Sequence, residues 1–518
     1  ASAVPDLLDA AGHPGLAEAW RAAGGTPGTG PAQAGVPGEL PSTLRRQALE
    51  ALGYRREDGG LLATPTLAEL ADAVGEAGAD LLLYLVPGED EVPGMVIAVG
   101  PHLGAGTGAL PLLSGTGSGP LERYLDAADA RGTGTGTGTG REPDPDAEQA
   151  WEDALGALCD WAFQVLGPVL AGIEERLTDA GRLDGRPLRA VLVPCGRLGI
   201  VPWHAARFPA EAPYDHLCQT AVISYAASGG QFLRTVRRAP RDPAAAPVLV
   251  ADPTMDLVHA DVEVRALRDA FYPEARLCGE IFDEPAERLG AGTPDEILTR
   301  LADGASLLHV ATHGSAGTRP TVSALRLAAP EDAPEDAPKD ATEDADDAGL
   351  LTVTRLLDRT GPRYGPADGA ADGPLVVLSA CETDLSTRDH DEALTLTTAF
   401  VSGGARDVVG SRWTTRDSTS ALLMAVFHHH LAVDGLSPVD ALRAAQLWML
   451  DPHRENPGSL DGELLREMRR PGLDRIPLWA AFVHQGHPGR SGRSGRREAR
   501  TRTMTDGTTD GTGEGRDA

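Results

Sequence analysis

Lysine and aromatic residues are both scarce in this sequence. Lys339 is the single lysine among 518 residues, and Phe, Trp and Tyr together make up 4% of the chain. Because Lys339 does not follow a glycine-rich loop, the sequence lacks a Walker A phosphate-binding loop, and a lysine Schiff base with pyridoxal phosphate is disfavoured. A Gly-x-Ser-x-Gly elbow is missing as well. These absences argue against nucleotide hydrolysis, pyridoxal chemistry and serine-hydrolase chemistry, and we expect no cofactor.

Cysteine is limited to five scattered residues without a Cys-x-x-Cys pair, which leaves no zinc motif. An odd number of separate cysteines is typical of free thiols in a reducing compartment, so we expect a cytoplasmic protein. A signal peptide and an apolar run of about 18 residues are also missing, so we expect no membrane span. The chain opens on Ala1 rather than methionine, so processing or excision from a longer protein is one hypothesis.

The net charge of −30 at pH 7 disfavours direct binding to nucleic acid, because a phosphate footprint needs a basic surface. Part of this charge comes from a repetitive acidic segment at 329–349. An acidic surface also favours solubility, so the charge by itself names no partner. The length allows two or three domains with sizeable cores.

The sequence does contain two apolar runs that each lead into a reactive side chain. Leu307–Gly314 carries His313 near its end, and Leu375–Thr383 leads into Cys381. Runs without alternation predict strands buried on both faces of a mostly parallel sheet, in which functional residues gather at the carboxyl ends of the strands. If the two strands are neighbours, His313 can convert Cys381 into a nucleophilic thiolate. A structural cysteine at a strand end is the alternative.

These two motifs and several others in the same order resemble the CHAT domains, bacterial members of the caspase–separase group of cysteine peptidases. The further segments that carry the resemblance are Val191–Pro194, Val201–Ala205, Ala399–Ala405, Val408–Trp413, Ala441–Gln446 and Trp479–Val483. The resemblance covers roughly residues 75–487. It implies a caspase-like α/β fold with a mostly parallel sheet flanked by helices, a non-catalytic caspase-like half ahead of it, and a His313–Cys381 dyad without a third member.

Composition and resemblance together divide the chain into four parts. We expect an N-terminal helical and linker segment at 1–50, a non-catalytic regulatory α/β half at 51–240 with a Gly-Thr linker at 131–147, a catalytic domain at 245–487 with a disordered acidic insertion at 329–349, and a disordered tail at 488–518. Residues 80–86 and 94–99 predict a hairpin. A parallel sheet with crossover helices is predicted from the strand candidates at 248–251, 306–312, 322–327, 374–380 and 407–411.

Gly314 directly follows the proposed base. A residue without a Cβ lets its backbone amide approach a substrate carbonyl, where it would act as an oxyanion donor alongside the amide of Cys381. A tight turn at the end of the strand explains the glycine as well, and the two roles are compatible.

Asp417 and Arg412 are the candidates for substrate binding, because they lie in a segment that resembles the wall of the pocket for the residue before the cleaved bond. A carboxylate at Asp417 would select arginine or lysine, and a charge at a helix N-terminus is the alternative. Arg412 would instead select an acidic residue. Asp384, Asp391 and Glu392 form a further acidic set, for which a solvated loop is the simpler interpretation. Relatives often have glycines where this chain has Asp384 and its neighbours.

The remaining histidines have simpler interpretations than metal binding. His309 and His313 share a strand face by their even spacing, but no third ligand is evident, so a packing role is favoured for His309. His428–His430 are predicted to lie on a partly exposed helix face. The sequence therefore predicts no metal site.

Together these observations predict a cysteine endopeptidase that cleaves a protein substrate through an acyl-enzyme on Cys381. The resemblance implies a bacterial defence or signalling system, with activation by a protein partner or an upstream sensor. A catalytically silent caspase-like scaffold for protein contacts is the alternative. We further hypothesise self-processing within 329–349 and the arginine-bearing tail, which an unchanged intact mass under activating conditions would contradict.

Overall fold

The computed structural model describes residues 13–24, 65–88, 92–113, 119–134, 144–282, 284–285, 289–317, 320–330, 348–360, 372–384 and 394–489. Its contacts separate residues 1–66 from residues 67–518. The first unit contains helix α2 (Pro14–Gly24), which falls within the helical segment predicted at 1–50. The other elements described below belong to the second unit.

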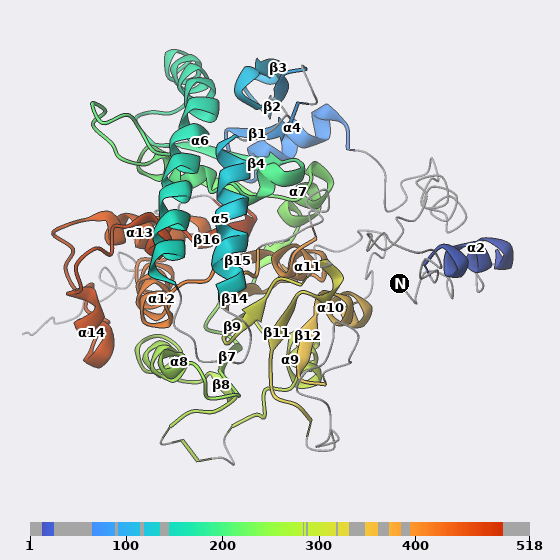
Figure 1. Cartoon of the computed structure of the whole chain (residues 1–518), viewed down its shortest axis with the longest axis vertical. Coiled ribbons are helices and arrows are strands. Elements are labelled where there is room, and N and C mark those ends of the chain that lie inside the picture. The colour runs from blue at the N-terminus through green and yellow to red at the C-terminus, as the bar shows by residue number, and fades with distance from the viewer. Residues whose placement is uncertain are drawn as a thin grey trace, which may run out of the picture. The chain divides into compact units, whose positions relative to one another are not determined.

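An 11-stranded sheet forms the centre of the second unit (Figure 1). Its strands, in spatial order, are β3 (Gly104–Leu110), β2 (Gly94–Gly100), β1 (Leu81–Val86), β4 (Leu188–Pro194), β5 (Ala221–Tyr225), β16 (Phe482–Gly486), β15 (Asp407–Ser411), β14 (Leu375–Ser379), β9 (Leu307–Ala311), β7 (Pro247–Ala251) and β8 (Arg276–Cys278). The six strands from β5 to β7 are buried along their whole length, as expected for apolar strands covered on both faces.

The two predicted α/β halves contribute to this one sheet. We call residues 67–240 the first half and residues 245–489 the second half. Strands β1, β4 and β5 of the first half are parallel to one another, and so are β15, β14, β9, β7 and β8 of the second half. Strand β16 is parallel to β5 and antiparallel to β15, so it joins the halves. The predicted α/β fold with a mostly parallel sheet is confirmed, as is the hairpin of β1 and β2.

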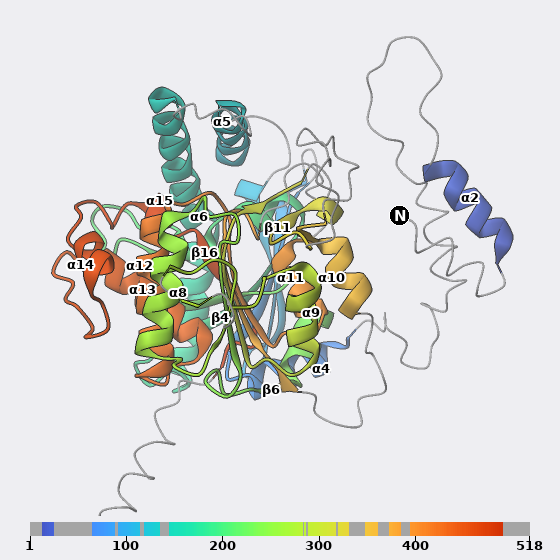
Figure 2. The ribbon, with the colours of Figure 1, turned by 90° about the horizontal axis from the view of Figure 1, so that it is seen from below.

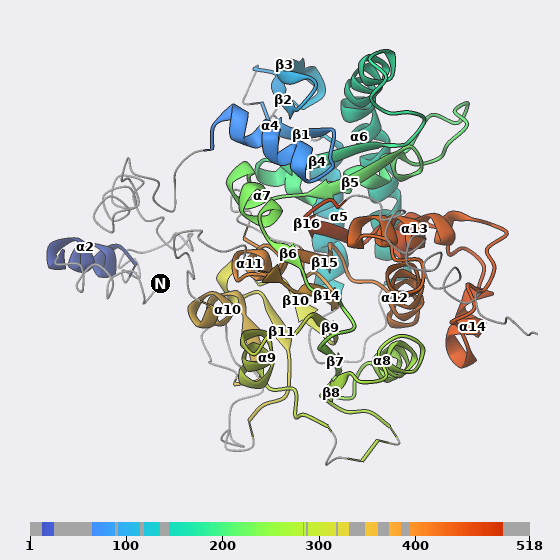
Figure 3. The ribbon, with the colours of Figure 1, turned by 180° about the vertical axis from the view of Figure 1, so that it is seen from behind.

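Helices cover both faces of the sheet (Figures 2 and 3). One face carries α6 (Pro145–Asp179), α8 (Val258–Ala270), α12 (Asp417–Ala432) and α13 (Pro438–Leu450), whose apolar residues share one core with the sheet. The opposite face carries α9 (Pro294–Ala302), α10 (Val353–Thr360) and α11 (Leu396–Ser402) over the second half, and α4 (Leu67–Glu76) and α7 (Gly229–Val236) over the first. Side-chain caps at Ser228, Thr293 and Ser437 fix where α7, α9 and α13 begin.

The predicted strand at 322–327 does not belong to the parallel sheet. The middle residues of this segment form β11 (Ala324–Arg326). This strand pairs antiparallel with β10 (Gly314–Ser315) and β12 (Leu350–Thr352) in a separate three-stranded sheet. The segment between His313 and β11 is too short for the crossover connection that a parallel strand needs. The chain therefore turns back as a hairpin instead. This small sheet fixes the backbone directly after the predicted base.

Parts of the predicted linkers are helical. The Gly-Thr linker was expected at 131–147, but α5 (Pro120–Gly134) extends to residue 134 and α6 begins at residue 145, after the N-cap Asp144. Residues 135–143 lie outside the described residues, as do 331–347 of the acidic insertion and 490–518 of the tail.

Helix α6 is long and apolar enough to cross a membrane by length and composition, which the sequence analysis did not anticipate. The same criterion is met by core helices of globular domains. Within the described structure, its residues Trp151, Leu155 and Leu158 are at most 1% exposed and belong to the core beneath the sheet. Its apolar character therefore has a packing explanation.

Candidate active site

The pairing of β9 with β14 brings the two predicted catalytic residues to one edge of the sheet. The parallel register runs from Leu307 opposite Leu375 to Ala311 opposite Ser379. His313 and Cys381 each follow the last paired residue by two positions, so they leave neighbouring strands at the same carboxyl edge. The predicted juxtaposition depends on this register.

Gly314 lies directly against the residue that carries the thiol. A Cβ built on Gly314 would stand 2.3 Å from the carbonyl oxygen of Cys381, so a larger residue requires a backbone shift. The amide of Arg326 donates to the carbonyl of His313 at 2.9 Å. Because hydrogen-bonded pairs alternate along an antiparallel ladder, Gly314 and its partner Leu325 form a non-hydrogen-bonded pair. The Gly314 amide therefore points away from β11.

The Cys381 thiol is partly buried, and burial raises its pKa. A hydrogen bond from the backbone of Thr415 and one from the side chain of Thr414 act in the opposite direction, while the negative charges of Glu382 and Asp417 add to the increase in the pKa. Among the hydrogen bonds of the described residues, none joins the imidazole of His313 to this thiol. The two side chains are neighbours by register but are not hydrogen-bonded in this structure.

The turn after the thiol is attached to the end of β15. Glu382 has a φ of 55°, a left-handed conformation that is uncommon for a residue with a side chain. The hydroxyl of Thr383 accepts a hydrogen bond from the Ser411 amide at 2.9 Å, and the amide of Asp384 donates to the Ser411 carbonyl at 2.7 Å. The Ser411 hydroxyl donates to the carbonyl of Ala380 at 2.5 Å. One residue of β15 thus fixes the backbone on both sides of Cys381.

Asp417 lies close enough to Cys381 to influence the pKa of the thiol, and it is also the first residue of α12. Its Oδ2 accepts a hydrogen bond from the backbone amide of His259 at 2.7 Å, in the first turn of α8. The side chain is 27% exposed. The helix-terminus role considered above is therefore present, and the charge of Asp417 also acts on the pKa of the Cys381 thiol.

Arg412 does not face the site. Its residue is 2% exposed, its Cζ lies 4.4 Å above the ring centroid of Tyr225, and its Nη1 donates to the carbonyl of Val201. Its Nε lies 3.5 Å from Oδ2 of Asp384. The prediction that Arg412 binds an acidic substrate residue requires correction, because protein groups already surround the guanidinium.

Asp384 is also buried, at 7% exposure, which corrects its interpretation as part of a solvated loop. Asp391 and Glu392 lie outside the described residues. The predicted exposed face at His428–His430 is wrong for His428, which is 0% exposed on α12. Its neighbours in the tripeptide are partly exposed, as predicted.

A buried polar network beneath the site escaped the sequence analysis. Glu263 of α8 is 1% exposed; its Oε1 lies 2.7 Å from Nε2 of His309, and its Oε2 accepts from the Ser379 hydroxyl at 3.1 Å. Nδ1 of His309 lies 3.2 Å from Nε2 of His428, which in turn reaches the hydroxyl of Tyr272 through Nδ1 at 2.8 Å. The predicted packing role of His309 is confirmed. The sequence signal that could have predicted this network is Glu263, a charged residue among the buried apolar residues of α8.

The described residues contain no group of three or more His, Cys, Asp or Glu side chains arranged to hold a metal ion.

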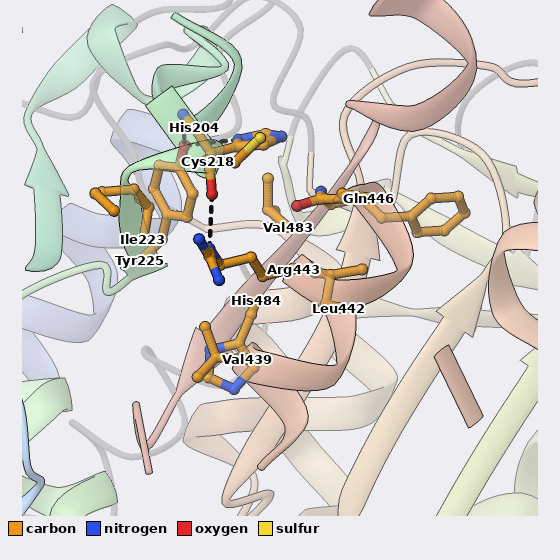
Figure 4. Close-up of a pocket in the computed structure, with 12 residues that line it drawn as sticks. His204, Cys218, Ile223, Tyr225, Val439, Leu442, Arg443, Gln446, Val483 and His484 are labelled. Carbon is orange, nitrogen blue, oxygen red and sulfur yellow. Dashed lines mark hydrogen bonds between the residues drawn. The ribbon is translucent and has the colours of Figure 1, made fainter. Parts of the chain in front are cut away.

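A pocket elsewhere is lined by residues of β5, β16 and α13 (Figure 4). Arg443 extends across it, with Nε donating to the Cys218 carbonyl at 2.6 Å and Nη2 to that of Gln219 at 2.9 Å. Hydrogen bonds from Arg443 thus hold the two sides of this pocket together. Neither His313 nor Cys381 lines it.

If Gly314 has its predicted oxyanion role, replacing it by alanine is expected to lower kcat/KM for a cleavable peptide by about 100- to 1,000-fold, because the new Cβ displaces the backbone that carries the predicted donor. Gly172→Ala is the matched control, since a Cβ there meets nothing within 4 Å. Steady-state kinetics of the two variants test this. Equal turnover in both variants would contradict the oxyanion role.

Comparison with known proteins assigns the family. The model of the CHAT domain matches residues 153–487. Among solved structures, the chain is similar to a chain of the Saccharomyces cerevisiae separase–securin complex, with a TM-score of 0.47 and 10% identity over 85% of this chain and 31% of that chain. It is also similar to the Arg-specific cysteine proteinase gingipain R, with a TM-score of 0.35 and 13% identity over 66% of this chain and 76% of that chain.

The chain spans less than one third of the separase-complex chain that it matches. No protein of curated function matches it. Because the CHAT family model covers well over half of the sequence and includes both the histidine and the cysteine motif, the chain belongs to the CHAT domain family and has a caspase-like cysteine peptidase fold.

Proposed function

We propose that this protein is a cysteine endopeptidase that cleaves a protein substrate, with Cys381 as the nucleophile and His313 as the base. The observation that carries the proposal is the register of β9 and β14, which brings both residues to one sheet edge with Gly314 against the Cys381 carbonyl. A histidine beside a cysteine at the carboxyl ends of parallel strands is suited to thiolate chemistry.

In the proposed reaction, His313 takes the thiol proton, and Sγ of Cys381 bonds to the carbonyl carbon of the scissile peptide. The tetrahedral intermediate then collapses, the C–N bond breaks, and His313 returns the proton to the leaving amine. Water hydrolyses the resulting thioester, which releases the carboxylic acid and restores the thiol. The amides of Gly314 and Cys381 are the proposed donors to the oxyanion.

The resting arrangement supports activation by an additional factor. No hydrogen bond among the described residues joins the thiol to His313, and burial raises the pKa of the thiol, so little thiolate forms unaided. We infer that an activating protein partner or sensor, or the substrate itself, moves the imidazole onto the thiol. Membership of the CHAT family supports a bacterial defence or signalling role, and the free cysteines support the proposed cytoplasmic location.

Asp417 is the proposed selector of a basic substrate residue. Asp417→Asn is expected to lower kcat/KM for peptides cleaved after arginine by about 10- to 100-fold, because a hydrogen bond to a charged group contributes about 1.5–3 kcal/mol. Asparagine keeps an acceptor for the His259 amide, so the α8 contact survives. Cleavage of a mixed peptide library, read by mass spectrometry, measures the effect. Asp434→Asn is the surface control and Cys381→Ala the blank, and cysteine-dependent cuts after acidic residues would contradict the proposal.

The missing hydrogen bond between His313 and Cys381 favours one alternative, a catalytically silent scaffold. A peptide-based electrophile aimed at thiols separates the two functions. An active dyad gives labelling of Cys381 that is lost in His313→Ala, whereas a scaffold gives the same slow labelling in both proteins.

A further inference from the structure

The two halves of the second unit are joined at the β5–β16 border mainly by side chains. Among the described residues, these two strands pair at one position, Gln485 opposite Tyr225. Side chains provide the other links: Nδ1 of His484 lies 2.8 Å from the hydroxyl of Ser224, and Nε2 of His204 lies 3.1 Å from the carbonyl oxygen of Ala480. A joint of this kind can transmit a movement of one half to specific residues of the other.

Arg412 connects this joint to the turn that carries the proposed nucleophile, because it contacts residues of both halves. On the side of the first half, the guanidinium stacks over Tyr225 and donates to the carbonyl of Val201. On the side of the second half, its Nε lies 3.5 Å from the carboxylate of Asp384, three residues after Cys381. Two successive contacts, Tyr225 with Arg412 and Arg412 with Asp384, thus link β5 to the turn that carries the thiol.

Asp384 in turn contacts β15, β16 and the N-cap residue of α11. Its amide donates to Ser411, and its Oδ1 accepts from Thr395 at 3.2 Å, at the first residues described beyond the turn. The same oxygen accepts from Gln485 of β16 at 2.6 Å. Burial raises the pKa of Asp384 to about 6, and the positive charge of Arg412 opposes this increase. Arg412, together with the hydrogen bonds from Thr395 and Gln485, therefore favours the ionised carboxylate at this buried position.

A buried ion pair contributes little net stability, because desolvation offsets most of its attraction, and its best-supported use is to specify one arrangement among several. We propose that Arg412 and Asp384 form a positioning pair through which the first half holds the turn of Cys381 in place. The inference deepens the proposed function, in which Cys381 is the nucleophile. It gives the non-catalytic half a direct route to the site: movement of Tyr225 releases Arg412 and, with it, the turn.

The test measures the reactivity of Cys381 independently of catalysis. The rate of alkylation by iodoacetamide is followed at the Cys381 peptide by mass spectrometry, with Cys195 of the first half as the internal reference. Tyr225→Leu removes the ring beneath Arg412 and is expected to raise the rate at Cys381 about tenfold, because a loosened turn exposes the thiol. Tyr225→Phe keeps the ring and should leave the rate unchanged.

Tyr84→Leu is the matched control, because Tyr84 and Tyr225 are both strand residues of the first half whose hydroxyls accept from a backbone amide. The donor is Gly229 at 3.0 Å for Tyr84 and His204 at 3.2 Å for Tyr225. The double variant D384N/R412M removes both charges together and should also raise the rate about tenfold. Unfolding midpoints are measured for each variant. Equal rates at Cys381 in wild type, Tyr225→Leu and the double variant, or equal increases in Tyr225→Leu and Tyr84→Leu, would overturn the inference.

Failure of the proposed function gives a different result. If the protein is a silent scaffold, no peptide is cleaved and His313→Ala leaves the labelling of Cys381 unchanged, while the alkylation rates still report whether the pair holds the turn. A double variant that does not fold leaves the comparison of Tyr225→Leu with Tyr225→Phe, in which equal rates oppose the inference and unequal rates support it.

Discussion

Replacing His313 by alanine is expected to lower the turnover of a cleavable peptide by about 100- to 10,000-fold, the usual contribution of a general base. Burial raises the pKa of the Cys381 thiol, so without the imidazole little thiolate forms at neutral pH. Cys381→Ala removes the attacking atom and should abolish turnover. Steady-state kinetics on a peptide from the cleavage library measures both effects.

His453→Ala is the control for loss of a histidine, because that residue is exposed, far along the chain in the segment after α13. Cys195→Ala is the control for loss of a partly buried thiol. Both should keep the turnover of the wild type. Full activity of His313→Ala would rule out the dyad, and activity of Cys381→Ala would move the nucleophile elsewhere.

Glu263→Leu is expected to lower the free energy of unfolding by about 3–5 kcal/mol, the usual result of removing one partner of a buried pair. Glu263 is 1% exposed and its carboxylate contacts His309 of β9 at 2.7 Å and the hydroxyl of Ser379 of β14 at 3.1 Å. Its removal leaves two buried polar groups without this partner. Urea unfolding followed by circular dichroism measures the change.

Asp269→Leu on the same helix is the matched control. Asp269 pairs with Arg268 at 2.7 Å, but its side chain is 66% exposed, so water replaces the lost contact and the change should stay below about 1 kcal/mol. Glu263→Gln keeps one acceptor and should fall between the two. An equal, small loss in Glu263→Leu and Asp269→Leu would show that the network does not stabilise the joined strands β9 and β14.

Local sequence patterns were sufficient to predict the two strands that lead to His313 and Cys381 and the residues at their ends. Leu307–Ala311 and Leu375–Ser379 are apolar without alternation, and strands covered on both faces need that composition. The His-Gly and Cys motifs follow these runs directly, so the sheet edge on which they lie follows from strand direction alone. The order of the motifs resembles that of the CHAT domains, and this resemblance agrees with the match of the CHAT family model to residues 153–487.

Only the tertiary structure decided the surroundings of these residues. Arg412 could be read as a substrate ligand because nothing near it in sequence predicts that Val201 and Tyr225, about 200 residues earlier, enclose it. Asp384 looked like a loop charge until its partners Arg412 and Gln485 were placed beside it. Periodicity reports which faces are buried, but the partner of a buried charge is chosen by long-range packing, which the local pattern does not encode.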